Sequence, residues 1–369
     1  MKRFNSMLLL IVVAVFIGCD TQTAPTSVDA VAVRDDAMLV RARIAAEAAE
    51  MRAEADRLMA LAQQSLAARK TAPRVLSPSG IIEVPGDFTS IQDAVDNAAP
   101  GDVIRVRGAF KDQGVINVSV ENITLDGTRA HLEGRDDIFA RIQVSADDVR
   151  IIGFTLKKMR IWVGGGDRVE VTDNHISHTG SALAVFGGSR DCIVKNNQAH
   201  NSAHGLFLSD TEDNLVEKNN FHSNRNAGII LTDDGTANMP THNNTLVDNN
   251  VNGNRRGLRV FNSNGNVITD CNVNSSELSN IVLFESTGNV LTDCTANGNG
   301  LRGILLLDSD DNEIHAGTAN GNRRVGIELI SSDNNIVEDS QAHGNKVCDA
   351  VDGGTGNMFS GNKFGSFNC

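Results

Sequence analysis

Two consecutive stretches decide the fold: NVLTDCTANGNGLRGILLLDSDD at residues 289–311 and NEIHAGTANGNRRVGIELISSDN at residues 312–334. Each has 23 residues, and similar residue types fall at the same positions in both. Short apolar alternations, such as Gly303 to Leu307, are separated by Asn, Gly, Asp and Ser, which are strand and turn signals. We therefore expect short strands joined by turns, repeated along the chain.

This period extends well beyond the two stretches. An asparagine that begins an Asn-x-Ile/Val/Leu pattern recurs at spacings of 30, 22, 23, 23, 23 and 22 residues, at Asn214, Asn244, Asn266, Asn289, Asn312, Asn335 and Asn357. A unit of 22–23 residues with three short strands fits one rung of a parallel β-solenoid, whereas propeller blades and most helical repeats are longer. The prediction is an all-β solenoid of about eleven to twelve rungs over residues 81–369.

Asparagine is the most unusual feature of the composition, with 34 of 38 asparagines at or after Asn174. Equivalent side chains of an in-register solenoid stack about 4.8 Å apart. Amides in such a column can therefore hydrogen-bond to the rungs above and below. We predict two columns, one beginning Asn196, Asn219, Asn249 and the other beginning Asn201, Asn224, Asn254, and we assign them no catalysis.

Residues 84–104, VPGDFTSIQDAVDNAAPGDVI, resemble the N-terminal cap and first rung of right-handed parallel β-helix proteins of the pectate-lyase-like superfamily. Residues 148–156, DVRIIGFTL, resemble the next characteristic turn of these proteins. A cap helix is expected at about residues 89–98, begun by Thr89 or Ser90. The superfamily includes lyases, hydrolases, epimerases, adhesins and copper-handling proteins, so this resemblance implies the fold and leaves the function open.

The first 80 residues have a different composition. Lys2 and Arg3 precede an apolar run that ends before Cys19, which is too short to span a bilayer and is typical of a signal peptide. The end of this run resembles the lipobox of bacterial lipoproteins, which implies removal of residues 1–18 and lipid attachment at Cys19. Plain secretion is the alternative. Residues 19–80 are then an anchor, a spacer and a linker of an exported envelope protein in the periplasm, the outer membrane or at the cell surface.

The spacer is expected to contain a long Ala-rich helix from Val28 to Lys70, with a narrow apolar seam that includes Ile44, Ala48 and Met51. The outward positions of one solenoid sheet are also unusually apolar, at Ala184, Phe207, Ile230, Arg259, Val282, Leu305 and Glu328. Something should cover such a face. The candidates are this helix, a partner protein and, last, a sugar.

Three groups of polar residues are candidate sites. The net charge is −13, which argues against a nucleic-acid partner. Even so, basic residues recur in one turn, at Arg225, Arg255, Arg256, Arg302, Arg323 and Arg324. They could bind an acidic polysaccharide. Alternatively, they could form a solvated edge of the solenoid. Histidines from successive rungs form another group, at His178, His200, His204 and His222, with His175 nearby. They could bind Zn or Cu, and this grouping resembles the periplasmic copper-binding β-helix proteins linked to nitrous-oxide reductase maturation. Alternatively, these side chains could form hydrogen bonds within the turns.

Asp233 and Asp234 open the one insertion in the repeat and are weak candidates for acid–base catalysis or Ca²⁺ binding. The Asp-Pro-His motif expected of mannuronan epimerases is missing from the sequence. Cys348 and Cys369, about one rung apart at the C-terminal end, are expected to form a disulfide in an oxidising envelope. No cofactor is required by these patterns.

These observations favour non-catalytic binding of a polysaccharide or of an envelope partner. The arginines point to an acidic polysaccharide. A lyase, epimerase or hydrolase of the superfamily is the second hypothesis. A copper-binding accessory protein is the third.

Overall fold

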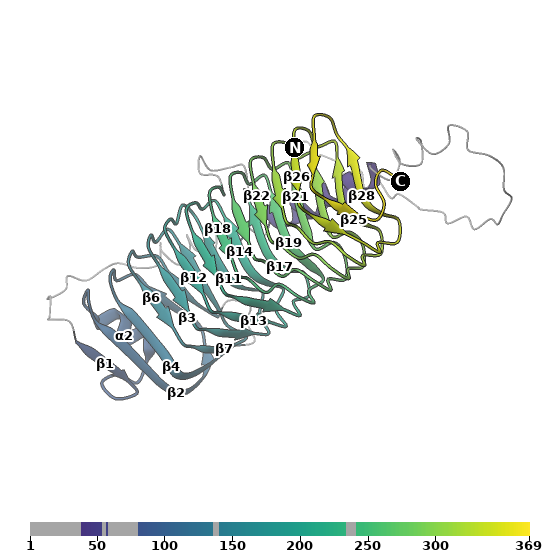
Figure 1. The fold of residues 1–369 in the computed structure, drawn as a ribbon. Coiled ribbons are helices and arrows are strands. Elements are labelled where there is room, and N and C mark those ends of the chain that lie inside the picture. The colour runs from purple at the N-terminus through teal and green to yellow at the C-terminus, as the bar shows by residue number, and fades with distance from the viewer. Residues whose placement is uncertain (1–37, 54–56, 58–79, 136–139, 234–240) are drawn as a thin grey trace, which may run out of the picture. The chain divides into compact units, whose positions relative to one another are not determined.

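The computed structural model describes residues 38–53, 57, 80–135, 140–233 and 241–369. From Ile81 onward the chain forms a parallel β-solenoid of about 12 turns, as the repeat predicts (Figure 1). Two large sheets of parallel strands run along it. The smaller is an 11-stranded sheet of β3 (Val115–Val118), β5 (Arg141–Val144), β8 (Arg160–Gly164), β11 (Ser181–Phe186), β14 (His204–Ser209), β17 (Ala227–Thr232), β19 (Arg256–Phe261), β21 (Ile281–Phe284), β23 (Ile304–Leu307), β25 (Val325–Ile330) and β28 (Cys348–Gly353).

The larger sheet has 17 strands, because the long strands β2 and β4 join two stacks. One stack contains β1 (Ile81–Val84), β2 (Val103–Gln113), β4 (Thr124–Gly134), β6 (Arg150–Ile152), β9 (Glu170–Thr172), β12 (Ile193–Lys195), β15 (Leu215–Glu217), β18 (Thr245–Val247), β20 (Val267–Thr269), β22 (Val290–Thr292), β24 (Glu313–His315), β26 (Ile336–Glu338) and β29 (Met358–Ser360). The other contains β7 (Thr155–Lys157), β10 (His175–Ser177), β13 (Gln198–His200) and β16 (Asn220–His222), and β27 (Gln341–Ala342) pairs with β30 (Lys363–Phe364) near the C-terminus.

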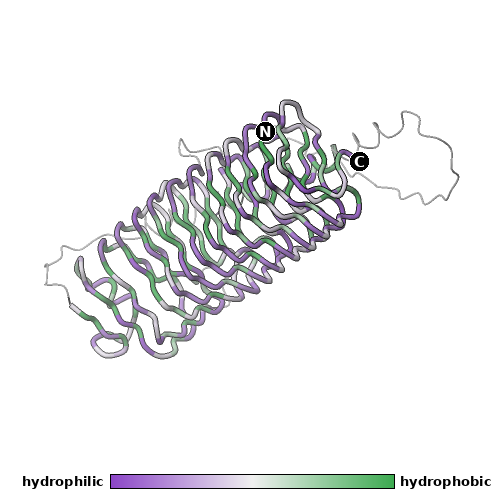
Figure 2. Tube along the Cα trace, viewed as in Figure 1, coloured by the Kyte–Doolittle hydropathy of each residue, from purple (hydrophilic) through white to green (hydrophobic). Residues whose placement is uncertain are grey.

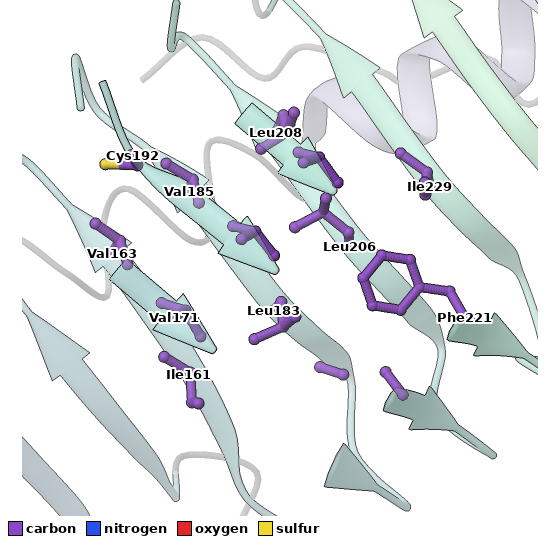
Figure 3. Close-up of a cluster of buried hydrophobic side chains, with 14 of the residues drawn as sticks. Ile161, Val163, Val171, Leu183, Val185, Cys192, Leu206, Leu208, Phe221 and Ile229 are labelled. Carbon is purple, nitrogen blue, oxygen red and sulfur yellow. The ribbon is translucent and has the colours of Figure 1, made fainter. Parts of the chain in front are cut away.

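The interior is a continuous column of aliphatic side chains. Leu183 pairs in register with Leu206, and Ile281 with Ile304, so like residues stack on like from rung to rung. Figure 3 shows part of this column, with Ile161, Leu183 and Leu206 at the same level of successive rungs. The apolar segments recur at the same place in each turn, between hydrophilic turns (Figure 2). This burial is the main favourable contribution to folding.

The helix α2 (Ile91–Asn97) closes the N-terminal end, inside the range of 89–98 expected from the sequence. Ser90 is the N-cap, and its side chain accepts a hydrogen bond from the Asp93 backbone at 3.3 Å. Ile91, Ala94 and Val95 are buried against the first rungs. No helix among the described residues is both long and apolar enough to cross a membrane.

Asparagine amides form ladders along the solenoid. In the ladder through Asn289, the Asn266 backbone donates to Asn289 Oδ1 at 3.0 Å and the Asn289 amide donates to Asn312 Oδ1 at 3.0 Å. Because the amides are buried and each bond links two rungs, the ladder satisfies the turn backbone without water. Asn214 and Asn244 continue it at 2.8 Å although they are 30 residues apart.

The structure corrects the predicted columns. The asparagines that marked the repeat form a further ladder themselves. Asn252, Asn274, Asn297 and Asn320 form another. The predicted first members are each one residue too early: Asn197 and Ser202 occupy the ladder positions, while Asn196 and Asn201 precede them with φ of 54° and 52°. Asparagine tolerates this left-handed conformation, so both roles select the same residue type.

Residues 38–53 are helical. Of the rest of the expected Val28–Lys70 helix only residue 57 is described, and residues 1–18 and Cys19 lie outside the described residues. Within residues 41–53, the seam residues Ile44, Ala48 and Met51 are buried. The segment contacts the outer face of the 11-stranded sheet through three ion pairs, Arg41–Asp308, Arg52–Glu285 and Glu47–Arg259. It therefore covers the apolar face near β19, β21 and β23.

Candidate functional site

Four histidines gather on three neighbouring rungs, and we call His175, His178, His200 and His222 the histidine cluster. His200 and His222 occupy equivalent positions of β13 and β16, so their rings stack with centroids 5.3 Å apart. His175 begins β10, and His178 follows that strand with φ of 58°. The parallel register places Ser177 beside His200, which brings the histidines of β10 within reach of the next rung.

The closest contact joins His175 Nε2 and His200 Nε2, 2.8 Å apart. The amide of Asn201 donates to His200 Nδ1 at 3.0 Å, which leaves the ring proton on Nε2, directed at His175. The His178 ring lies 6.2 Å from the His200 ring, centroid to centroid. Imidazole nitrogens from three rungs thus converge on His200.

The environment of His200 and His222 favours their neutral form. Partial burial lowers the pKa of His200 and His222, and the neighbouring His175 lowers both further. A neutral imidazole is the form that ligates a metal. Among the described residues, however, no three potential ligands already surround one metal position. The imidazoles are donors of the kind that a transition metal prefers, but in this structure they do not form a metal site.

His204, grouped with these histidines on spacing alone, lies apart from them. It is buried, Ser181 Oγ is 3.0 Å from its Nδ1, and the Asn226 amide is 2.8 Å from its Nε2. Burial, together with the charge of Arg256, lowers its pKa to about 4. With both ring nitrogens hydrogen-bonded inside the protein, His204 serves the fold.

The six candidate arginines do not form a single ridge. Arg225, Arg255 and Arg323 are exposed, and Arg324 is half-buried. Arg225 and Arg255 hold equivalent turn positions of adjacent rungs, but Glu277 and Gly300 occupy that position in the next two rungs, before Arg323 and Lys346. The exposed positive charge is therefore divided into two short groups.

Arg256 and Arg302 are buried and paired within the protein. Arg302 bonds to Glu328. Arg256 and Arg259 both approach Glu47 Oε1, which lies 2.9 Å and 2.7 Å from their respective Nε atoms. We call Arg256 and Arg259 the carboxylate site. These long-range pairs, with Glu47 and Glu328 as partners, leave no room for the polysaccharide role expected of Arg256 and Arg302.

The remaining candidates are placed as follows. Asp233 ends the described part of its rung, where its charge opposes the lowering of the His242 pKa by burial. Asp234 lies outside the described residues. A disulfide joins Cys348 and Cys369, with Cα atoms 5.7 Å apart, and ties the last rung to the chain end. Cys192, Cys271 and Cys294 are buried free thiols.

Sequence reasoning found most of the histidine cluster and missed the carboxylate site. Arg259 was noted only as an outward position, and Glu47 was not singled out. A signal was present for both, because a charged residue interrupts an otherwise apolar surface in each case: Arg259 on the sheet face and Glu47 beside the helical seam.

Comparison with known proteins supports the solenoid. Residues 104–255 match the family described as "Right handed beta helix region", and residues 232–369 match "Periplasmic copper-binding protein (NosD)". No curated protein sequence matches the chain.

Solved structures with a similar fold include two alginate-modifying enzymes. The A-module of the Azotobacter vinelandii mannuronan C-5 epimerase AlgE6 is 15% identical over 85% of this chain and 94% of its own, with a TM-score of 0.62. The periplasmic alginate epimerase AlgG is 16% identical over 75% of this chain and 71% of its own, with a TM-score of 0.58. Together with the strand register, these similarities show that the fold of this chain is a right-handed parallel β-helix.

Proposed function

We propose that this protein binds a transition-metal ion, copper first among them, through the histidine cluster. The contact between His175 Nε2 and His200 Nε2 carries the proposal, because it brings two imidazole donors from adjacent rungs to 2.8 Å. His222 and His178 lie next to His200 and can complete a ligand set. Imidazole suits Cu and Zn, and Cu²⁺ binds nitrogen ligands more tightly than Zn²⁺.

The similarity to the copper-binding family is a second support. It covers residues 232–369, which are the rungs that follow the histidine cluster, so it suggests the metal without assigning the ligands. In this proposal His175 and His200 bind the ion through Nε2, and His178 or His222 supplies a third nitrogen. Metal binding at Nε2 moves the ring proton of His200 to Nδ1, so the Asn201 amide must turn its oxygen toward Nδ1 to orient the ring. A bound copper ion would supply a cationic centre for transfer to another protein, without chemistry by this chain.

The test is copper titration of the full chain by calorimetry, with electron paramagnetic resonance of Cu²⁺. Wild type is expected to bind one equivalent with nitrogen hyperfine coupling, and His175→Ala with His200→Ala should lose that equivalent. His343→Ala, which removes an exposed histidine elsewhere, is the matched control and should bind as wild type does. Equal binding by the double variant, or substoichiometric binding by wild type, would contradict the proposal.

Binding of an acidic polysaccharide without catalysis is the second candidate. Arg225 and Arg255 support it, because both are exposed and occupy one turn position on adjacent rungs, a spacing that can meet successive carboxylates. The fold likeness to alginate epimerases adds only the scaffold. Wild type should then bind alginate at low salt, and Arg225→Ala with Arg255→Ala should weaken binding at least tenfold. Failure of wild type to bind would remove this candidate.

We place either activity in the cell envelope. The apolar run before Cys19 supports export and lipid anchoring, and the matching family and one structural neighbour are both described as periplasmic. Mass spectrometry of the mature N-terminus, with Cys19→Ser as control, tests the anchor: a diacylglyceryl adduct at Cys19 is expected, and an unmodified or upstream N-terminus would contradict it.

A further inference from the structure

Two buried cysteines stack on adjacent rungs, and we call Cys271 and Cys294 the thiol pair. A parallel β-bridge joins the residues that follow them, Asn272 and Thr295, and the Thr295 backbone donates to the Cys271 carbonyl at 2.9 Å. The cysteines therefore occupy equivalent positions of neighbouring rungs, about 4.8 Å apart along the solenoid. They are 0% and 1% exposed, and a hydrogen bond joins the two side chains.

The sulfur atoms take the place of amide oxygens in an asparagine ladder. In the preceding rungs, Asn249 Oδ1 accepts hydrogen bonds from the backbone and the side chain of Asn219, both at 3.0 Å. Cys271 comes next, and its sulfur accepts from the backbone and the side chain of Asn249 in the same way. The sulfur of Cys294 accepts from the Cys271 backbone. Both sulfurs thus face N–H groups of the neighbouring rung, which stabilise a thiolate.

The spacing of the thiol pair is wrong for a disulfide and right for a bridging ion. A disulfide needs Cβ atoms about 3.5–4.5 Å apart, whereas side chains in register on adjacent rungs point the same way at about 4.8 Å. Both thiols are accordingly free, while Cys348 and Cys369 are bonded. With metal–sulfur bonds of about 2.3 Å, a linear sulfur–metal–sulfur unit spans about 4.6 Å, close to one rung.

This arrangement selects a soft ion that is satisfied by two ligands. Thiolates favour Cu⁺, whose filled d shell allows two ligands in line. Zn²⁺ instead takes four ligands in protein sites, and no position in the described part of the chain is surrounded by three potential ligands. Two stacked thiolates therefore fit Cu⁺ better than Zn²⁺.

The thiol pair lies directly beneath an acidic turn. Asp270 and Asp293 precede the two cysteines, and both are exposed, with φ of 52°. Asp248 is exposed at the same place in the preceding rung, with φ of 55°. Three carboxylates thus stack along the surface next to the sulfurs, where they raise the local concentration of cations.

We propose that the thiol pair binds one Cu⁺ ion as a linear two-coordinate site. Binding replaces the two thiol protons, which leave to solvent, and the ion keeps its oxidation state. The thiol pair lies within residues 232–369, which match the periplasmic copper-binding family, whereas the histidine cluster precedes that range. The site shares no residue with the histidine cluster, so the two proposals can fail separately.

The test is an anaerobic competition for Cu⁺, in the full chain with Cys19→Ser. The ion is supplied as its bathocuproine disulfonate complex, whose absorbance reports what the protein withdraws. One equivalent should be withdrawn, with two sulfur ligands at about 2.3 Å by X-ray absorption. Cys271→Asn and Cys294→Ser should each lose this equivalent. Cys192→Ser, which alters another buried free thiol, is the matched control and should retain it.

Both test variants place in the ladder a residue that it already contains, asparagine as at Asn249 or serine as at Ser340, so the rungs should remain intact. Urea denaturation checks this. His175→Ala with His200→Ala should retain the Cu⁺ equivalent, whatever happens to its Cu²⁺ binding. No withdrawal by the parent chain, retention by both cysteine variants, or nitrogen ligands in place of sulfur would overturn the thiol site and leave the histidine proposal to its own test.

Discussion

In the histidine cluster, imidazoles contact one another near the surface, whereas Arg256 and Arg259 lie buried against a single carboxylate. Both groups arise in the same way, by repetition of one residue type in adjacent rungs or along one strand. They differ in whether the protein already supplies the counterpart. Glu47 neutralises the arginines. The histidines contact one another instead, so of the two groups only the histidine cluster can still bind an ion.

The largest expected effect tests the buried arginines of the carboxylate site. Arg259→Ala should lower the free energy of unfolding by about 3–5 kcal/mol, because it leaves Glu47 buried with a weaker partner and removes hydrogen bonds to three carbonyls. Urea denaturation of the full chain measures this. Arg255→Ala, at an exposed neighbouring position, should change stability by no more than about 0.5 kcal/mol. Equal losses in the two variants would break the contrast.

The second-largest expected effect concerns His204, which, like Arg256 and Arg259, is buried and has polar partners inside the protein. Its folded pKa of about 4 is below the ordinary value of 6.5, so the unfolded chain binds a proton that the folded chain excludes. Its contribution is therefore present above pH 6.5 and is lost as the pH falls toward 4, by about 3 kcal/mol. His204→Gln should flatten the pH dependence of the urea midpoint over that window. An unchanged slope would show that His204 does not titrate in this way.

The smallest effect is expected in the histidine cluster without metal. His200→Ala should alter the free energy of unfolding by no more than about 0.5 kcal/mol, because the ring is partly exposed and its neighbours can bond to water. With saturating copper, wild type should gain stability and the variant should not. A large loss in the metal-free variant would instead assign this cluster to the fold.

The repeat predicted the solenoid because period, strand length and turn residues all agree at each rung. The outward positions from Ala184 to Leu305 follow from the same alternation and are indeed outside the interior cluster. The errors occur where one residue type has two roles. Asn196 and Asn197 differ by one position, yet one takes the left-handed turn and the other the ladder.

The site was less predictable, because its decisive contacts join distant parts of the sequence. Nothing near Arg256 reveals that Glu47 neutralises it, and spacing alone placed His204 with the histidine cluster although Ser181 and Asn226 bind it inside. Register shows which residues share a column. Only the folded structure shows which of them already have partners.

The 30-residue interval between Asn214 and Asn244 has the same amide contact as the 23-residue intervals elsewhere. The amide ladder thus stays in register although this interval contains more residues than the others. Protein engineers can use that tolerance: a peptide tag or binding loop grafted between Asp233 and Thr241 should leave the rungs above and below in register.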